Sequence, residues 1–241
     1  MTVGPRVAFV DDIESQISPL DEAVRDMKAG SIYFNANPEY AVYPDSPLDT
    51  VRLLFLDLYY KKDFDPEMSA NWVRKIIPKD TPYELVIWSK DTHEAERLMH
   101  ILNDIHLTPS RTELWQKSDF TRIEELKSKV KEITQQIPNY EQITQEDFIG
   151  EVLEIEDDGV LVNCNLKPGF PVFQVRKFDL DLLSKVNGLK PGKFVKIMIY
   201  SKPGSRLIDI IEDRQDRQEI FQVPDYFKGL EGTTFFKADD I

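Results

Sequence analysis

The chain has 241 residues, with 43 aspartates and glutamates against 30 lysines and arginines, which gives a formal net charge of −13. This excess of acid repels nucleic-acid phosphates and anionic lipid surfaces, so we expect no nucleic-acid partner and no membrane association. A single cysteine excludes an internal disulfide, and with only three histidines it cannot build a zinc cluster. The sequence has neither a signal-peptide pattern nor an apolar stretch near the ~20 residues of a membrane span, so the cytoplasm is the expected compartment.

In the first half of the chain, short apolar runs alternate with amphipathic helical patterns. Unbroken apolar runs are typical of strands that are buried on both faces of a parallel sheet. The expected strands are 6–10, Ser31–Asn35, 51–56, 84–88 and Arg111–Gln116, and the expected helices are 19–28, 66–77 and 93–105. This alternation predicts an α/β fold with a doubly wound, five-stranded parallel sheet.

A longer helix is predicted after residue 119, because apolar side chains recur there at intervals of three and four residues, with Ser118 or Asp119 as its cap. The pattern favours a last helix that packs on its own sheet, and the alternative is a homodimer seam. Pro138 ends the helix. The expected domains are therefore 1–137, a linker at 138–145, a β-rich domain at 146–212 and a tail at 213–241.

The β-rich domain begins with a predicted hairpin around Asp157-Asp158-Gly159, where Asp-Gly suits a type I′ turn. Three strands, a short helix at 178–185 and two further strands fit a small all-β barrel, OB-like or alternatively SH3-like. The tail carries aromatic residues without a period, which we expect to contact a protein partner. They are Phe221, Tyr226, Phe227, Phe235 and Phe236.

Polar residues stand where four of the predicted strands end. Asp11 and Asp12 follow the first strand, Asp57 the third, Ser89 the fourth and Lys117 the fifth. Three carboxylates brought together repel one another unless a divalent cation such as Mg²⁺ lies among them. In this set Asp57 could attack a phosphoryl group, while the lysine and the hydroxyl bind its oxygens.

These segments resemble the motifs of response-regulator receiver domains, which act in bacterial two-component phosphorelay signalling. The matching segments are 7–12 (VAFVDD), 53–57 (LLFLD), 86–89 (VIWS) and 114–117 (LWQK), within a resemblance that covers roughly residues 5–135. The resemblance implies a flavodoxin-like receiver fold in which Asp57 is phosphorylated by a histidine kinase or another phosphodonor. It also implies that Asp12, Asp57 and the Tyr59 backbone carbonyl hold Mg²⁺, with Asp11 acting through water. Ser89 would be the switch hydroxyl and Lys117 the amine that senses the phosphate.

Several positions depart from the receiver pattern. Lys90 replaces the usual small residue after the switch hydroxyl and would project a second cation at the phosphate. Leu114 stands in place of the usual aromatic switch, and Ser118 in place of the usual proline. The loop 58–66 is long, charged and lacks the usual Pro-Gly pair. The resemblance therefore extends to the acceptor set but not to the parts that relay its signal.

The expected function is a phosphoacceptor signalling protein that switches a protein-binding β-barrel, with no enzymatic activity beyond its own phosphorylation and dephosphorylation. The alternatives are a phosphate-independent pseudo-receiver adaptor, a haloacid-dehalogenase-like phosphatase and a nucleic-acid-binding OB module. The phosphatase is disfavoured because its nucleophile precedes the acid pair and has a second aspartate two residues later. Here the pair Asp11-Asp12 comes first, and the position two after Asp57 is Tyr59.

Overall fold

The computed structural model describes residues 3–61, 63–137, 142–165, 173–178, 186, 188–202 and 204–213. The chain divides into two compact units. The first, here called the α/β unit, is Met1–Gln145 together with Tyr200–Arg206, and the second, the β unit, is Glu146–Ile199 together with Leu207–Ile241.

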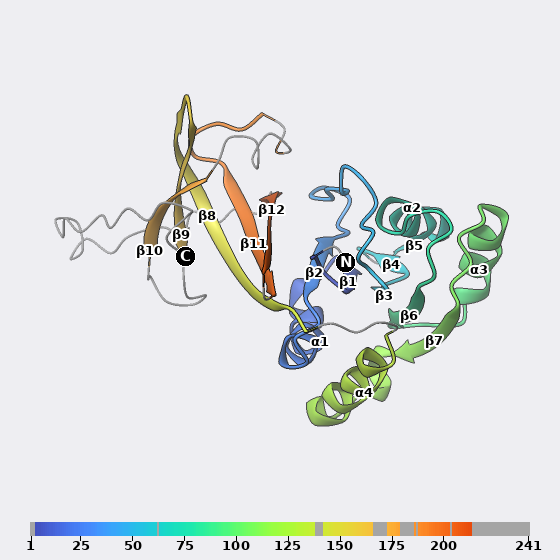
Figure 1. The fold of residues 1–241 in the computed structure, drawn as a ribbon. Helices are drawn as coiled ribbons and strands as arrows, with labels where there is room; N and C mark the ends of the chain where they lie inside the picture. Colours follow the sequence, from blue (N-terminus) through green and yellow to red (C-terminus); the bar gives the residue numbers. More distant parts are fainter. Residues whose placement is uncertain are drawn as a thin grey trace. The chain divides into compact units, whose positions relative to one another are not determined.

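Five parallel strands form the sheet of the α/β unit (Figure 1). They are β1 (Val7–Asp11), β2 (Ser31–Asn35), β3 (Leu53–Leu56), β6 (Glu84–Ser89) and β7 (Arg111–Gln116). Their spatial order is β2-β1-β3-β6-β7, which is the flavodoxin-like order of doubly wound sheets. The predicted parallel sheet is therefore confirmed, and its central strands β1 and β3 are buried along their whole length.

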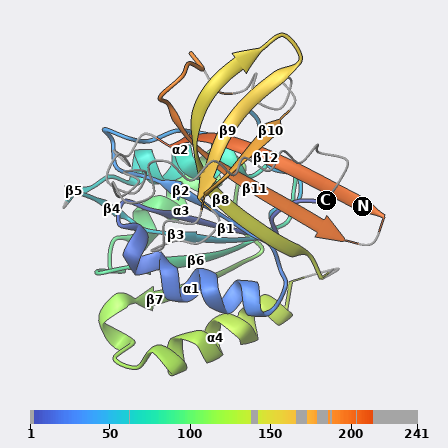
Figure 2. The same ribbon diagram turned by 90° about the vertical axis from the view of Figure 1, so that its left-hand side faces the viewer.

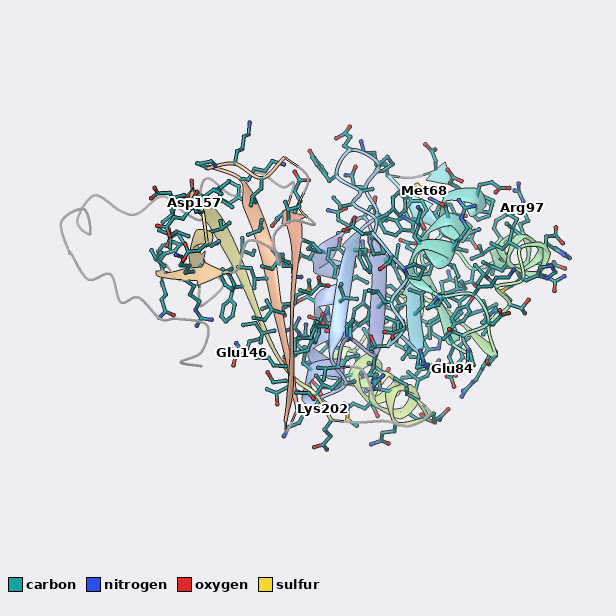
Figure 3. The ribbon with its side chains drawn as sticks, turned by 45° about the horizontal axis from the view of Figure 1, so that its top comes forward. Met68, Glu84, Arg97, Glu146, Asp157 and Lys202 are labelled. Carbon is teal, nitrogen blue, oxygen red and sulfur yellow. The ribbon has the colours of Figure 1, made fainter. Side chains whose placement is uncertain are left out.

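Two helices cover each face of this sheet. α1 (Glu14–Asp26) and α4 (Ile123–Gln135) lie side by side on one face, and α2 (Pro66–Ile76) and α3 (Ala95–Asp104) cover the other (Figure 2). Met68 of α2 and Arg97 of α3 mark that second pair in Figure 3. The apolar stripe of α4 packs with α1 against Phe9, Phe55 and Trp115, as expected for a last helix that packs on its own sheet.

Two helices begin at residues other than those expected. α1 starts at Glu14, so Pro19 lies inside the helix and does not open it. The missing N–H of Pro19 leaves the carbonyl of Ser15 unpaired within the helix, but Ser15 is exposed and water can satisfy it. α4 begins at Ile123, and the residue before it, Arg122, makes no side-chain capping bond. Ser118 and Asp119 do not cap α4, because they belong to a short 3₁₀ helix, η1 (Lys117–Asp119). The expected caps were therefore wrong.

A small hairpin, which no expected element covered, follows β3. It consists of β4 (Tyr59–Tyr60) and β5 (Asp63–Phe64), paired antiparallel. Asp65 then caps α2 through a hydrogen bond from the Met68 N–H, with Pro66 in the first turn. The hairpin thus occupies the loop that joins the end of β3 to its crossover helix.

A second five-stranded sheet, of order β10-β9-β8-β11-β12, forms most of the described β unit, and its β8–β9 and β9–β10 pairs are antiparallel. Its strands are β8 (Thr144–Glu156), β9 (Gly159–Asn165), β10 (Phe173–Phe178), β11 (Phe194–Lys202) and β12 (Ser205–Asp213). The all-β architecture of this part is therefore present. Its closure into an OB-like or SH3-like barrel stays a prediction, because the strand order of the described residues leaves β10 and β12 at the edges.

The first hairpin of the β unit lies where it was expected but turns differently. Glu156 pairs with Gly159, so Asp157 and Asp158 form the corner of the turn. Neither Asp157 nor Asp158 has a positive φ, and Gly159 has none either. A type I′ turn needs positive φ at both corner residues, so that assignment was wrong. Gly159 is required for a different reason: a Cβ there would lie 2.8 Å from the backbone oxygen of Phe178. The helix predicted at 178–185 begins at a residue that ends β10, Phe178, and its other residues lie outside the described part of the chain, as do the tail aromatics.

Candidate phosphoacceptor site

The polar strand ends meet at the topological switch point of the parallel sheet. From β1 the chain order runs to β2 on one side and to β3 on the other, which opens a crevice at the carboxyl ends of β1 and β3. Asp11 ends β1, and Asp57 directly follows β3, its N–H bonded to the Val10 carbonyl at 2.9 Å. The main chain therefore fixes the two carboxylates at neighbouring positions of one sheet edge.

Three carboxylates form a compact cluster at this edge. Ligand oxygens of Asp11, Asp12 and Asp57 all lie within 4.8 Å of one another. Asp11 and Asp57 are buried, and Asp12 is partly exposed. Oxygen donors at this spacing are the ligands that hard divalent cations prefer, so the donor set fits such an ion and the cluster could bind a metal.

Asp57 is the most highly coordinated of the three side chains. Its Oδ1 accepts hydrogen bonds from the backbone N–H groups of Leu58 at 2.7 Å and Tyr59 at 3.2 Å, and from Ser89 Oγ at 2.6 Å. Its Oδ2 accepts a bond from Lys117 Nζ at 2.6 Å. The carboxylate plane is thus fixed by the main chain, with a hydroxyl at one oxygen and an ammonium group at the other.

Lys117 joins the cluster from the residue that follows β7. Its ammonium group donates to Asp11 Oδ2 at 2.8 Å, to Asp57 Oδ2 at 2.6 Å and to Gln16 Oε1 at 2.6 Å. These three acceptors match the three N–H donors of a lysine. With one ammonium against three carboxylates, the local charge remains −2, which a divalent cation would neutralise.

The pKa of Asp11 shows that its burial disfavours the ionised carboxylate. Burial of the carboxylate, which disfavours its charged form, raises the pKa from 3.8 to about 6, and it outweighs the lowering effect of Lys117. The nearby charge of Asp57 raises the pKa of Asp11 further. Asp11 is therefore held in a place that opposes its ionised form at neutral pH.

Asp12 is engaged by the β4–β5 hairpin. Its Oδ2 accepts a hydrogen bond from the Lys61 N–H at 2.7 Å, and Lys61 has a left-handed backbone with φ of 60°. The Lys61 side chain turns to Glu39, with 2.5 Å between Nζ and Oε1. The backbone of Lys61, and not its charge, therefore contacts the acid cluster.

The ammonium group of Lys90 lies over the ring of Tyr59, 4.2 Å from the ring centre. Lys90 lines the same cavity as Asp57 and Lys117, and whether it contacts a phosphate there stays a prediction. The Tyr59 N–H bonds Asp57, and whether the Tyr59 carbonyl holds a cation stays a prediction. Burial raises the pKa of the Tyr59 hydroxyl.

The structure brings together every acceptor-set residue singled out from the sequence: Asp11, Asp12, Asp57, Ser89 and Lys117. Three further contributors were missed. Gln16 lies in the first turn of the helix after the acid pair, a position that could have been examined. Lys61 acts through its backbone and Tyr60 through a hydroxyl bond to the Asp57 carbonyl at 2.9 Å, and neither leaves a signal in the sequence.

A scan against protein-family models gives no match, and a search of curated proteins gives none either. Solved structures match the chain distantly. The signal receiver domain of a protein described as a Luxo repressor from Vibrio parahaemolyticus is 16% identical, with 56% of this chain and 93% of that chain covered and a TM-score of 0.33. The phosphorylated cyanobacterial phytochrome response regulator RcpA is 18% identical, with 56% and 95% covered and a TM-score of 0.35.

Another distant match, an adenylate cyclase from Rhodopirellula baltica, is 16% identical over 56% of this chain and 93% of that chain, with a TM-score of 0.33. Likenesses this remote say nothing of the site, so the flavodoxin-like fold rests on the chain's own strand order. Within the part that the structure describes, no helix is long and apolar enough to cross a membrane.

Proposed function

We propose that the α/β unit is a receiver-type phosphoacceptor module and that Asp57 takes the phosphoryl group. The observation that carries this proposal is the placement of Ser89 and Lys117 on the two oxygens of one buried carboxylate, beside two further carboxylates. A structural ion pair would need the lysine and one carboxylate. Asp11 and Asp12 add carboxylates that repel Asp57 and destabilise the protein without a bound cation. Such a cluster favours a functional role over a purely structural one.

The chain's own residues perform the transfer in a simple sequence. An oxygen of Asp57 attacks the phosphorus atom in line with the donor bond, which breaks and leaves its electron pair on the leaving group. Lys117, already 2.6 Å from Asp57 Oδ2, moves one N–H from the carboxylate to a phosphoryl oxygen. Ser89 Oγ, 2.6 Å from Oδ1, can likewise donate to the phosphoryl group. The charge that arrives is thus met by donors that are already in place.

The metal expected for such a site is Mg²⁺. Asp11, Asp12 and Asp57, with the Tyr59 carbonyl, would hold it, and when bound it would offset the negative charge of the phosphoryl oxygens. The unbalanced charge of the cluster supports this assignment.

The phosphorylated state would be read out by a protein partner, with a histidine kinase or another phosphodonor upstream and no further enzymatic activity. An acidic hairpin supports a protein partner over a polyanion: Glu151, Glu154, Glu156, Asp157 and Asp158 cluster on β8 and its turn. Leu153, Ile155 and Leu207 of the β unit are large apolar side chains more than one third exposed, which suits a protein contact. The tail aromatics and a homodimer through the last helix stay predictions, as does the cytoplasmic location.

One alternative function has a specific observation in its favour. Asp12, a proposed metal ligand, already accepts a hydrogen bond from the Lys61 N–H at Oδ2, and this competing contact favours a phosphate-independent adaptor to that extent. The phosphatase alternative has no such support, because Tyr59 stands where its general acid would be.

The deciding experiment is the intact mass of the full chain after incubation with Mg²⁺ and acetyl phosphate. We expect the wild type to gain one phosphoryl group and Asp57→Asn to gain none. Asp63→Asn, which removes an exposed carboxylate from the adjacent hairpin, is the matched control and should label like the wild type. Absence of labelling with any donor, together with no response to beryllofluoride, would establish the adaptor.

A further inference from the structure

The phosphoacceptor site opens into a cavity that the transfer chemistry alone does not require. The cavity has a volume of about 670 Å³ and extends from Asp57 and Lys117 toward the beginnings of α1 and α4. This volume lies within the range of sites that enclose a small organic molecule. A phosphoryl group would fill only a small part of it.

The far wall of the cavity is apolar. It is lined by Ile13, Pro19, Trp88, Phe120, Ile123 and Leu126. Trp88 and Leu126 are buried, whereas Ile13 and Ile123 are 44% and 51% exposed. Few large apolar side chains of the described residues are exposed to this degree. Aromatic and aliphatic walls with a few charged groups at one end are typical of sites for an amphipathic ligand.

The geometry of transfer determines which part of a donor meets this wall. Asp57 is only 4% exposed, and its inner side is taken up by the N–H groups of Leu58 and Tyr59, so a donor must approach through the cavity that Asp57 lines. In an in-line displacement the leaving group points away from the attacking oxygen. The leaving group therefore lies in the cavity, whose apolar lining includes Ile13, Trp88 and Ile123.

We propose that this cavity selects small-molecule phosphodonors with a flat, apolar leaving group, namely aromatic acyl phosphates. The inference rests on the proposed function and names its donor class. Asp57 attacks phosphorus, the bond between phosphorus and the acyl oxygen breaks, and the aromatic carboxylate leaves with the electron pair. The carboxylate charge spent at Asp57 reappears on the leaving group, so no proton or co-reactant is needed.

The test compares benzoyl phosphate with acetyl phosphate as donors to the full chain in Mg²⁺, by intact mass over time. Burying a ring in place of a methyl group should favour benzoyl phosphate by about tenfold or more in the second-order rate constant of labelling. Ile123→Ser should reduce that preference several-fold, because it removes an apolar side chain from the cavity rim. Leu114→Ser is the matched control, since Leu114 is 54% exposed and does not line the cavity, and it should leave the preference unchanged. The intrinsic reactivity of the donors cancels in these ratios between variants.

A second measurement separates the two proposals. Phenylphosphonate and methylphosphonate cannot transfer their phosphoryl groups, and their affinities can be measured by the change in tryptophan fluorescence, because Trp88 lines the cavity. Tighter binding of phenylphosphonate, weakened by Ile123→Ser, supports the cavity even in a chain that is never labelled, and in that case only the phosphoacceptor proposal fails. Equal labelling by the two acyl phosphates, unchanged in Ile123→Ser, overturns the inference and leaves Asp57 as the acceptor.

Discussion

Replacing Asp11 by asparagine should change how the stability of the protein depends on pH. Burial raises the pKa of the folded-state carboxyl from 3.8 to about 6, so between these values the folded protein binds more protons than the unfolded chain. Stability must then fall as the pH rises through this window. At 1.36 kcal/mol per tenfold change in the protonation equilibrium, the cost above pH 6 is about 3 kcal/mol.

Asp11→Asn removes the ionisable group and retains an oxygen that can accept the Ile13 N–H. The stability of the variant minus that of the wild type should therefore rise by about 2 kcal/mol between pH 4 and pH 7, since the unfolded carboxyl is already partly ionised at pH 4. Urea unfolding in EDTA gives both values. Tryptophan fluorescence reports on the α/β unit, because Trp72, Trp88 and Trp115 are the three tryptophans of the chain and lie in its core.

Asp12→Asn is the matched control, since it removes the adjacent carboxylate from a partly exposed position where water screens the charge. Its stability difference from the wild type should change less over the same pH range. The reasoning is refuted if the Asp11→Asn difference stays flat or falls with rising pH. A falling difference would mean that the ion pair with Lys117 outweighs the burial of Asp11.

Two further predictions concern the acid cluster, and a third concerns the β unit. Lys117→Met leaves buried Asp11 and Asp57 without their cation, so it should lower the free energy of unfolding at pH 7 by about 3 kcal/mol. The loss should be smaller at pH 5, where Asp11 is protonated, and urea titrations at both pH values test this. Mg²⁺ at ten times its dissociation constant should stabilise the wild type by about 1.4 kcal/mol, with a smaller rise in melting temperature for Asp12→Ala; equal rises would place the ion elsewhere. Gly159→Ala should destabilise the β unit by about 1–3 kcal/mol, because its Cβ would meet the Phe178 backbone oxygen, and faster hydrogen exchange in β9 with unchanged exchange in β1 measures the effect.

The core of the site could be predicted from the sequence because buried parallel strands leave a strong pattern. β1 and β3 read as unbroken apolar runs, and the first polar residue after each run marks the carboxyl end of the strand. In a doubly wound sheet those ends converge, so Asp11 and Asp57 could be placed together without any structure. Ser89 and Lys117 follow from the same rule at the ends of β6 and β7.

The features that were missed depend on backbone geometry, which residue patterns do not record. β4 and β5 have two residues each, too few for any periodicity, and Lys61 reaches Asp12 only through its N–H. The early start of α1 was hidden because Pro19 suggests a first helical turn, whereas here it lies in the second. The Asp-Gly sequence suggested a type I′ turn, but the glycine serves close packing of β9 against β10.

The position of Lys90 shows how a residue singled out from the sequence acquires a physical meaning only in three dimensions. In the sequence it places a cation directly after Ser89, which suggests contact with a phosphate bound nearby. In the structure the ring of Tyr59 holds that cation, and the Tyr59 N–H in turn bonds Asp57. The hairpin that carries Tyr59 also supplies the Lys61 N–H to Asp12. The β4–β5 hairpin therefore contacts Asp57 and Asp12 through its backbone N–H groups and Lys90 through the Tyr59 ring, so a ligand that changes the charge at Asp57 and Asp12 should perturb the hairpin as well.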